Sequence, residues 1–132
     1  MSIRSLYAMK QRNSSVQRLI ELDICQPSDI RQAEEEAKKL STPESAAKLR
    51  RAEKLVGAIG DSNRMKILLL LSKREMCVCE LESALGLPQP TVSHHLGLLE
   101  QADLLRRSKK GRFVFYEVQN SPVLDLLKNL TS

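Results

Sequence analysis

The sequence predicts a mainly α-helical protein that carries one small β-hairpin. Apolar residues recur at helical spacing through most of residues 43–101, and the period changes to two around Gly111. A short amphipathic segment, SPVLDLLKNL, follows the hairpin. These two periods distinguish helices from half-buried strands. The 132 residues suit one domain with an extension, so we expect an N-terminal extension over 1–42 and a domain over 43–132.

The composition narrows the class of protein. The formal net charge of +5 is compatible with a polyanionic partner. Neither a membrane-spanning apolar run nor a secretory signal is recognisable, so we expect a cytoplasmic protein without a membrane partner. Three cysteines are an odd number for a disulfide framework. They are better explained as free thiols that serve packing, redox chemistry or metal binding.

The extension holds one weak and one stronger helix pattern. A short helix is possible in the stretch VQRLIELDIC, and PSDIRQAEEEAKKL has a clearer signal. Ser28 can cap the second helix, and its acidic residues precede Lys38 and Lys39, which complements the helix dipole. Few apolar residues are present there, so we expect this helix to be exposed or to lean on a partner.

Two helices follow in the main domain. Thr42 caps the first and Pro43 suits its first position, while Gly60 ends it. Its apolar stripe consists of Ala46, Leu49, Ala52, Leu55, Val56 and Ile59. The next helix, DSNRMKILLLLSKRE, is capped by Asp61 or Ser62 and is nearly apolar all round, which predicts a central position.

The next elements predict a helix-turn-helix. A short helix over about 78–85 stops at Gly86, and the turn GLPQP leads into TVSHHLGLLEQA. Val92, Leu96 and Leu99 form the buried stripe of this last helix. Two helices joined by a tight turn that contains glycine are typical of this DNA-binding motif.

The hairpin after the motif predicts a wing. The stretch LLRRSKKGRFVFYEV alternates around a Lys-Lys-Gly turn and is dense in cations, which suits phosphate contact beside a groove. The second helix of the motif would read base edges with its first turns. The candidate DNA-binding residues are Gln89, Thr91, Ser93, His94, His95, Arg106, Arg107, Lys109, Lys110 and Arg112. Taken separately, either feature could be an ordinary solvated helix face or an exposed hairpin.

From about residue 55 to residue 118, the chain resembles the ArsR/SmtB family of metal-sensing repressors. The resemblance rests on EMCVCEL, the recognition helix and the basic wing, which occur in the family's order. It implies a winged helix-turn-helix homodimer that binds double-stranded operator DNA when metal-free and leaves it when a metal or metalloid binds. It also implies that the first and last helices form the dimer interface.

The resemblance also implies a metal site. Cys77 and Cys79 match the family's sensing cysteines, and Cys25 resembles the extension cysteines that cadmium and lead sensors of the family bring, often from the other protomer. The third cysteine that some arsenic sensors carry slightly further along the helix is absent here. The last helix has no histidine, so the family's second, zinc-type site is expected to be missing.

The spacing of Cys77 and Cys79 constrains the geometry of any shared ion. Side chains two apart on a helix diverge by about 200°. We therefore expect the pair at a non-helical start, or a helix that distorts on binding, and a helix start should also lower the thiol pKa. With Cys25 as a third thiolate, the site suits As(III) or Sb(III), and Cd(II), Pb(II) or Zn(II) are alternatives.

Other functions remain compatible with the sequence. The cysteines could be inert packing residues, or Cys25 could form a disulfide with Cys77 or Cys79 in a redox sensor. A winged-helix regulator of non-metal signals and a protein-interaction module are further alternatives. An enzyme with a cysteine nucleophile is disfavoured because both histidines belong to the DNA-facing helix.

Overall fold

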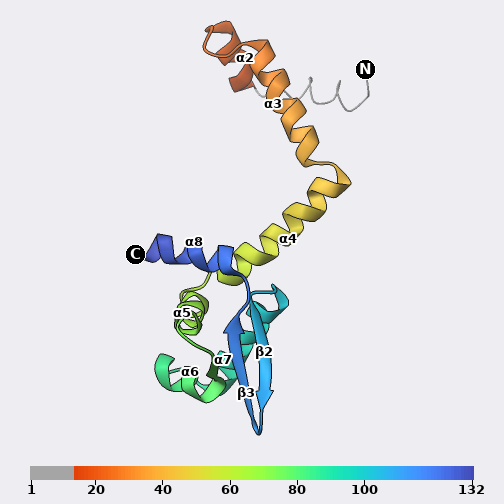
Figure 1. Ribbon diagram of the computed structural model, residues 1–132. Coiled ribbons are helices and arrows are strands. Elements are labelled where there is room, and N and C mark those ends of the chain that lie inside the picture. The colour runs from red at the N-terminus through yellow and green to blue at the C-terminus, as the bar shows by residue number, and fades with distance from the viewer. Residues whose placement is uncertain (1–13) are drawn as a thin grey trace. The chain divides into compact units, whose positions relative to one another are not determined.

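The computed structural model describes residues 14–132, and the chain divides into two compact units (Figure 1). The first unit ends at Ala47 and the second begins at Lys48. Both of these residues belong to helix α4 (Pro43–Ile59), so the division lies within that helix. The boundary expected from the sequence, between residues 42 and 43, falls at the start of the same helix.

Within residues 14–47, the first unit contains two further helices, and none of its described side chains is buried. Helix α2 (Ser14–Glu21) ends earlier than the pattern around residues 16–25 suggested, because Asp23 adopts a left-handed φ of 55°. Helix α3 (Pro27–Leu40) buries none of its residues. This agrees with the expectation of an exposed helix.

The cap of α3 differs from the prediction. Gln26, rather than Ser28, is the N-cap, since Pro27 occupies the first helical position that suits its missing N–H. The backbone N–H of Gln26 donates to the carboxylate of Asp29 at 3.0 Å.

The predicted caps of α4 and α5 are confirmed. The Thr42 hydroxyl accepts a hydrogen bond from the N–H of Ser45 at 3.2 Å. Helix α5 (Ser62–Leu71) is capped by Asp61, whose carboxylate accepts from the N–H groups of Asn63 and Arg64 at 2.9 and 3.1 Å. These contacts satisfy amide groups that the first turn of a helix leaves unpaired.

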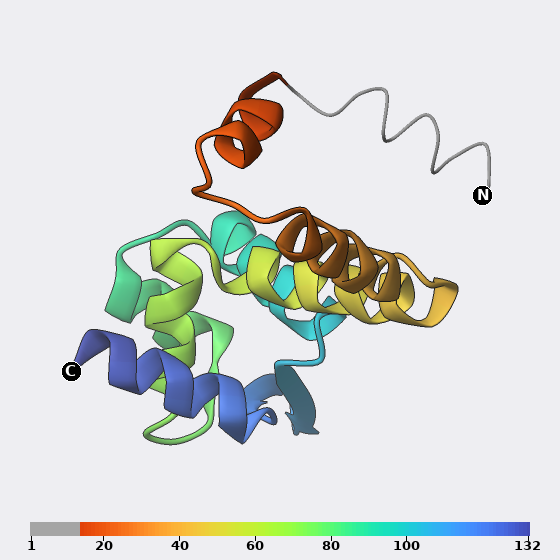
Figure 2. The ribbon, with the colours of Figure 1, turned by 90° about the horizontal axis from the view of Figure 1, so that it is seen from above.

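Helix α5 is central to the core of the second unit, as predicted. It contacts α7 (Gln89–Gln101) and α8 (Ser121–Thr131), and Figure 2 shows α8 crossing in front of it. The fully buried side chains are aliphatic: Ile67, Leu68, Leu81, Val92, Leu96, Leu99 and Leu104. With so few aromatic residues, the core depends on close packing of leucines.

The helix-turn-helix consists of α6 (Val78–Leu85) and α7. Gly86 ends α6 at a left-handed φ of 66°, a conformation that favours glycine. The intervening turn is short, and α7 begins at Gln89, two residues earlier than the predicted start at Thr91. Val92, Leu96 and Leu99 are buried as expected.

The predicted two-stranded hairpin is part of a three-stranded antiparallel sheet. Strands β2 (Leu105–Lys110) and β3 (Phe113–Val118) form the wing, with Gly111 at a left-handed φ of 62° in its turn. A third strand, β1 (Met76–Cys77), pairs with β3 to give the order β1-β3-β2. The two-residue β1 is too short to have a recognisable period, which explains why the sequence did not predict it.

Candidate metal centre and nucleic-acid interface

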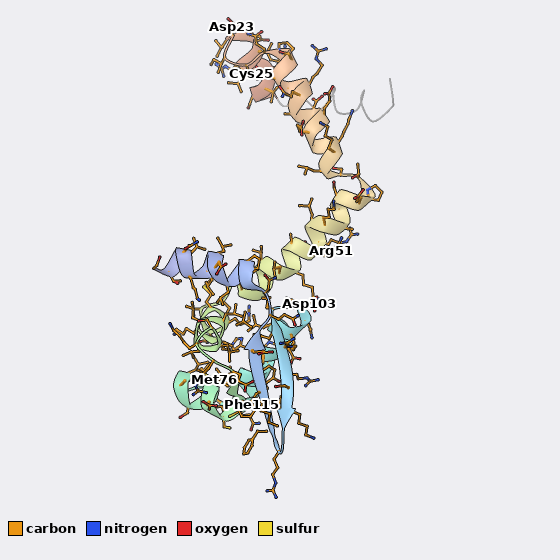
Figure 3. The ribbon with its side chains drawn as sticks, in the orientation of Figure 1. Asp23, Cys25, Arg51, Met76, Asp103 and Phe115 are labelled. Atoms are coloured by element: carbon orange, nitrogen blue, oxygen red, sulfur yellow. The ribbon has the colours of Figure 1, made fainter. Side chains whose placement is uncertain are left out.

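Cys77 stands at the junction between a strand and a helix. It is the last residue of β1, opposite Phe115 in β3, and the N-cap of α6. Its backbone is extended, with φ −85° and ψ 166°. Figure 3 labels its neighbours in this ladder, Met76 and Phe115. Pairing with β3 therefore holds Cys77 outside the helix and buries its side chain.

Cys79 lies in the first turn of α6, and its sulfur meets that of Cys77. The two Sγ atoms are 2.7 Å apart, and Cys79 is exposed while Cys77 is buried. The pair is therefore at a helix start, the first of the two geometries expected from the spacing. Since one thiol is outside the helix, no distortion of α6 is needed to bring the sulfurs together.

The pKa of Cys79 is raised, contrary to the expected effect of a helix start. The hydrogen bond with the Cys77 thiol raises it most, and burial and the charge of the Cys77 thiolate add to this. The backbone N–H groups of Cys79 and Glu80 lower the pKa by less. Proximity of a second thiol thus outweighs the helix start. A cation that binds both sulfurs must displace their protons.

Glu80 fixes the backbone at this junction. Its carboxylate accepts from the N–H of Cys77 at 3.4 Å and from the guanidinium of Arg74 at 2.5 Å. The hydrogen bond from Arg74 lowers the pKa of Glu80 below its usual range. Glu80 therefore stays ionised and serves as a cap of α6.

The thiol pair opens on a pocket of about 310 Å³. Polar groups from three elements share its wall: Glu82 from α6, Gln89 from the start of α7, and Arg112 from the wing turn. The remaining lining residues are Val78, Phe113 and Val114. The pocket therefore joins the cysteines to Gln89 and Arg112, two of the predicted DNA-binding residues. Glu82 was not among the predicted site residues, and its only signal in the sequence is its position one turn after Cys79.

In the described residues, the pocket brings together only two cysteine thiols as candidate sulfur ligands for a metal ion. Among residues 14–132, no three His, Cys, Asp or Glu side chains are grouped closely enough to hold a metal ion. Cys25 lies in the first unit, between α2 and α3, with its thiol 3.7 Å from the carbonyl oxygen of Gln26 (Figure 3). The structure thus brings together Cys77 and Cys79 and leaves the role of Cys25 as a prediction.

The first turns of α7 present most of the predicted base-contacting side chains to solvent. Gln89, Ser93 and His94 are exposed and Thr91 is partly exposed. His95 is only 8% exposed, and its Nδ1 lies 3.2 Å from the guanidinium of Arg64. A buried side chain offers little surface to a duplex, so the burial of His95 does not favour a direct DNA contact, and its role there stays a prediction. It follows Val92 by three positions and therefore shares the buried stripe.

The cations of the wing divide into paired and unpaired groups. Arg106 pairs with Glu117, Arg107 lies 3.4 Å from Glu100, and Lys110 pairs with Glu75 while lying over the ring of Phe115. Within the described part of the chain, Lys109 and Arg112 have no acidic partner. Among the cations of the wing, these two exposed side chains are therefore the most available for contact with a phosphate.

No helix in the described residues 14–132 is long and apolar enough to cross a membrane.

Comparison with known proteins agrees with this architecture. Residues 61–107 match the model of the family described as bacterial regulatory protein, arsR family. An uncharacterized HTH-type transcriptional regulator of Methanocaldococcus jannaschii is 38% identical over 82 residues, which cover 61% of this chain and 92% of that protein. The region matched by the family contains the helix-turn-helix, the thiol pair and the start of the wing.

Two further relatives have names that mention metals. The arsenical resistance operon repressor of Staphylococcus aureus is 36% identical over 72 residues, 54% of this chain and 69% of the relative. The cadmium resistance transcriptional regulatory protein CadC of Listeria innocua is 32% identical over 71 residues. That alignment covers 53% of this chain and 60% of CadC.

Among solved structures, reduced HlyU from Vibrio cholerae has a TM-score of 0.59 and 31% identity. The similarity covers 66% of this chain and 92% of HlyU. The sequence and structural matches agree with the helix-turn-helix and wing of the second unit. This chain belongs to the ArsR family of winged helix-turn-helix transcriptional regulators.

Proposed function

We propose that the protein is a repressor that binds operator DNA as a metal-free homodimer and is released when As(III) or Sb(III) binds Cys77 and Cys79. The observation that carries this proposal is the pocket beside α6. Two thiols 2.7 Å apart face a space whose wall includes Gln89 and Arg112, both candidate DNA contacts. An ion at the thiols would therefore act on the DNA-binding surface directly.

The donor atoms favour a thiophilic ion. Sulfur is a soft ligand, and two adjacent thiols suit As(III), Sb(III), Pb(II) or Cd(II) better than harder ions. Cys25, from its own protomer or its partner, is the proposed third ligand. A Cd(II), Pb(II) or Zn(II) sensor is the alternative within the family, and the names of the arsenical and cadmium relatives support both.

The proposed coupling is competition for shared residues. In the absence of an ion, Gln89 and Arg112 are free to contact bases and phosphates. An ion and its remaining ligands would occupy the pocket and draw these side chains or their backbones away from DNA. The ion would then bind the DNA-free protein more tightly than the DNA-bound protein. This difference in affinity is what any such switch requires.

The proposed homodimer rests on exposed apolar side chains of the second unit. Val56 on α4 is 62% exposed, and Leu130 on α8 is 73% exposed. Leu49, one heptad before Val56, and Leu126, one turn before Leu130, are also exposed. A second copy that covers these stripes would bury them and would place two recognition helices for successive half-sites.

A test combines DNA binding with a panel of ions. A duplex is selected from random sequence with the metal-free protein, and its binding is followed by fluorescence anisotropy. Arsenite, antimonite, Cd(II), Pb(II) and Zn(II) are then added separately. We expect arsenite or antimonite to release the duplex at the lowest concentration, with X-ray absorption reporting sulfur ligands around the ion. Release by Cd(II) or Pb(II) alone would select the alternative, and no release by any ion would refute metal sensing.

The dimer has a separate test. Leu130→Glu places a carboxylate in the proposed interface, whereas Leu22→Glu changes an exposed leucine of the first unit. We expect sedimentation to show a monomer for the first variant and a dimer for the second. A dimer in both variants would mean that the dimer interface does not include Leu130.

A thiol-redox regulator is the second candidate, favoured by the free and solvent-exposed thiol of Cys79 and the free, partly exposed thiol of Cys25. Hydrogen peroxide would oxidise two thiols to one disulfide, taking up their two protons and two electrons, and would be reduced to two waters. Cys25 with Cys77 or Cys79 is the proposed pair. Mass spectrometry after peroxide treatment of the metal-free protein distinguishes the candidates. Release of DNA together with loss of two free thiols would support redox sensing, and unchanged DNA binding would exclude it.

A further inference from the structure

Phe113 is an exposed aromatic side chain beside the thiol pair. It is the first residue of β3, next to the wing turn, and 55% of its surface is exposed. It lies outside the buried core of the described residues. It also lines the pocket of about 310 Å³ that contains Cys77 and Cys79. The ring of Phe113 therefore contributes little to the packing of the core and is available to a ligand in that pocket.

The wall of this pocket includes apolar surface that a bare ion would not use. Val78, at the start of α6, and Val114, in β3, are partly buried and line the pocket together with Phe113. The ligands of a metal ion are polar or charged, so this surface adds nothing to the binding of the ion alone. A molecule that carries an apolar group beside a thiophilic atom would use both the sulfurs and the apolar wall.

The number of sulfur atoms in the pocket favours the same kind of molecule. As(III) forms three bonds, so inorganic arsenite needs three thiolates to replace all of its oxygens. The pocket supplies two thiols, whose Sγ atoms are 2.7 Å apart, whereas Cys25 belongs to the first unit. When one of the three bonds of arsenic is to carbon, two thiolates are sufficient. An organic arsenical therefore matches the sulfur ligands that the pocket itself provides.

We propose that the thiol pocket binds trivalent arsenicals with one aryl substituent, whose arsenic is bound by Cys77 and Cys79 and whose ring packs against Phe113. The inference rests on the proposed function, because it names a further class of inducer for the same pocket. Cys25 takes no part in binding such a compound. The aryl group would lie in the pocket that Arg112 and Gln89 also line, and would therefore compete with their contacts to DNA.

The binding step is an exchange of ligands on arsenic. An arylarsonous acid, R–As(OH)₂, reacts with two thiols to give R–As(SCys)₂ and two waters. Two As–O bonds break and two As–S bonds form, and each thiol proton leaves with one hydroxyl group as water. The bond between arsenic and carbon stays intact. Arsenic remains trivalent, so the step needs no oxidant or reductant.

The first experiment compares three compounds on the metal-free full chain. Phenylarsonous acid, methylarsonous acid and arsenite are titrated separately into the complex with the selected duplex. We expect phenylarsonous acid to release DNA at about tenfold lower concentration than methylarsonous acid, because a contact between two aromatic rings contributes up to about tenfold in affinity. Phe113→Ala should bring the two concentrations together, and Phe113→Leu should give an intermediate ratio. A general loss of stability or of DNA affinity cancels in this ratio, so a merely structural role of Phe113 would not change it.

The cysteine variants separate this inference from the proposed function. Cys25→Ser should leave the half-release concentration of phenylarsonous acid unchanged and raise that of arsenite by about tenfold. Cys77→Ser should abolish release by phenylarsonous acid. Release by arsenite without release by phenylarsonous acid would overturn the inference and leave the proposed function standing. Release by phenylarsonous acid alone would support the inference and refute arsenite as an inducer. An equal effect of Cys25→Ser on both compounds, or no release by either, would overturn the inference.

Mass spectrometry of the wild-type protein provides a measurement that does not depend on the folding of a variant. Trypsin cleaves after Lys and Arg, so Cys77 and Cys79 share the peptide 75–106, whereas Cys25 is in the peptide 19–31. After treatment with phenylarsonous acid, we expect one phenylarsenic group that bridges the two cysteines within peptide 75–106. An arsenic bridge between the two peptides would overturn the inference.

Discussion

The two units of the chain use their apolar side chains in opposite ways. In the second unit, leucines and isoleucine of α5, α6 and α7 are fully buried together. In the first unit, Leu22, Ile24 and Leu40 are exposed, and α3 buries nothing. Helices of this length are marginal without tertiary packing. We therefore expect the second unit to carry most of the folding stability. Among residues 14–47 no buried cluster surrounds Cys25.

The largest expected difference between the units concerns stability. Leu68 of α5 is 1% exposed, so Leu68→Ala should lower the free energy of unfolding by about 3 kcal/mol, because it removes buried apolar surface and leaves a cavity. Leu40→Ala, at an exposed site of α3, should leave it within about 0.5 kcal/mol. Urea denaturation followed by circular dichroism measures both. Equal losses would mean that the first unit shares the core of the second.

The second difference concerns the inducer. Cys77 is held by β1 and by the capping carboxylate of Glu80, whereas Cys25 is in a loop of the first unit. Cys77→Ser should raise the arsenite concentration for half-release of DNA by about a hundredfold, because each thiolate contributes a large share of the binding energy. Cys25→Ser should have a smaller effect. DNA binding by the metal-free protein should be unchanged in both variants, which the same anisotropy titration checks. A larger effect of Cys25→Ser would make the first unit the main source of ligands.

The contrast also separates what the sequence predicted from what it did not. Helices α5, α6 and α7 and the wing have strong periods and clear end signals, such as Asp61 before α5 and Gly86 after α6. These features depend on neighbours in sequence, so they are readable from it. The ends of α2 and α3 were less accurate because their patterns are weak and Asp23 turns the chain unexpectedly early.

The site was predicted only in part because its details depend on tertiary contacts. The pairing of β1 with β3 places Cys77 outside α6, and no local pattern shows this pairing. Likewise, the raised pKa of Cys79 follows from its neighbour's sulfur and not from the helix start. The burial of His95 was readable from its spacing after Val92. The contact with Arg64, a residue 31 positions earlier, was not.

A third prediction compares two aspartates that support helix starts. Asp61 caps α5 in the second unit, and Asp29 accepts the N–H of Gln26 at the start of α3. Asp61→Ala should lower the melting temperature at pH 7, whereas Asp29→Ala should not change the main transition. Hydrogen bonds from the first turn of α5 lower the pKa of Asp61, so its stabilising contribution is present above the unfolded pKa and is lost as pH falls through the folded value.

The pH dependence provides the control for this comparison. The difference in melting temperature between the wild type and Asp61→Ala should be constant at neutral pH and shrink below about pH 4. Asp61→Asn keeps a good cap without a titrating group and should remain near the wild type at pH 7. Calorimetry at several pH values measures all three proteins. A difference that grows in acid would show that the charge of Asp61 is unfavourable in the folded state.

The smallest expected effect concerns single cations. Lys109 is exposed on the wing and has no acidic partner in the described part of the chain, so it is available to a phosphate. Lys109→Ala should weaken DNA binding a few-fold for all sequences alike. It should also reduce the slope of log affinity against log salt by about 0.9 for each phosphate that the protein no longer neutralises.

The pairing of the wing cations sharpens this last prediction. Arg106 already pairs with Glu117 on the neighbouring strand, so Arg106→Ala should change the salt slope less than Lys109→Ala does. Lys38→Ala, on exposed α3, removes the same charge from the first unit and should leave the slope unaltered. Because all three variants lose one positive charge, a net-charge effect would lower the slope equally in each. Only contact through the wing gives the order Lys109, Arg106, Lys38, and that order would confine DNA binding to the second unit.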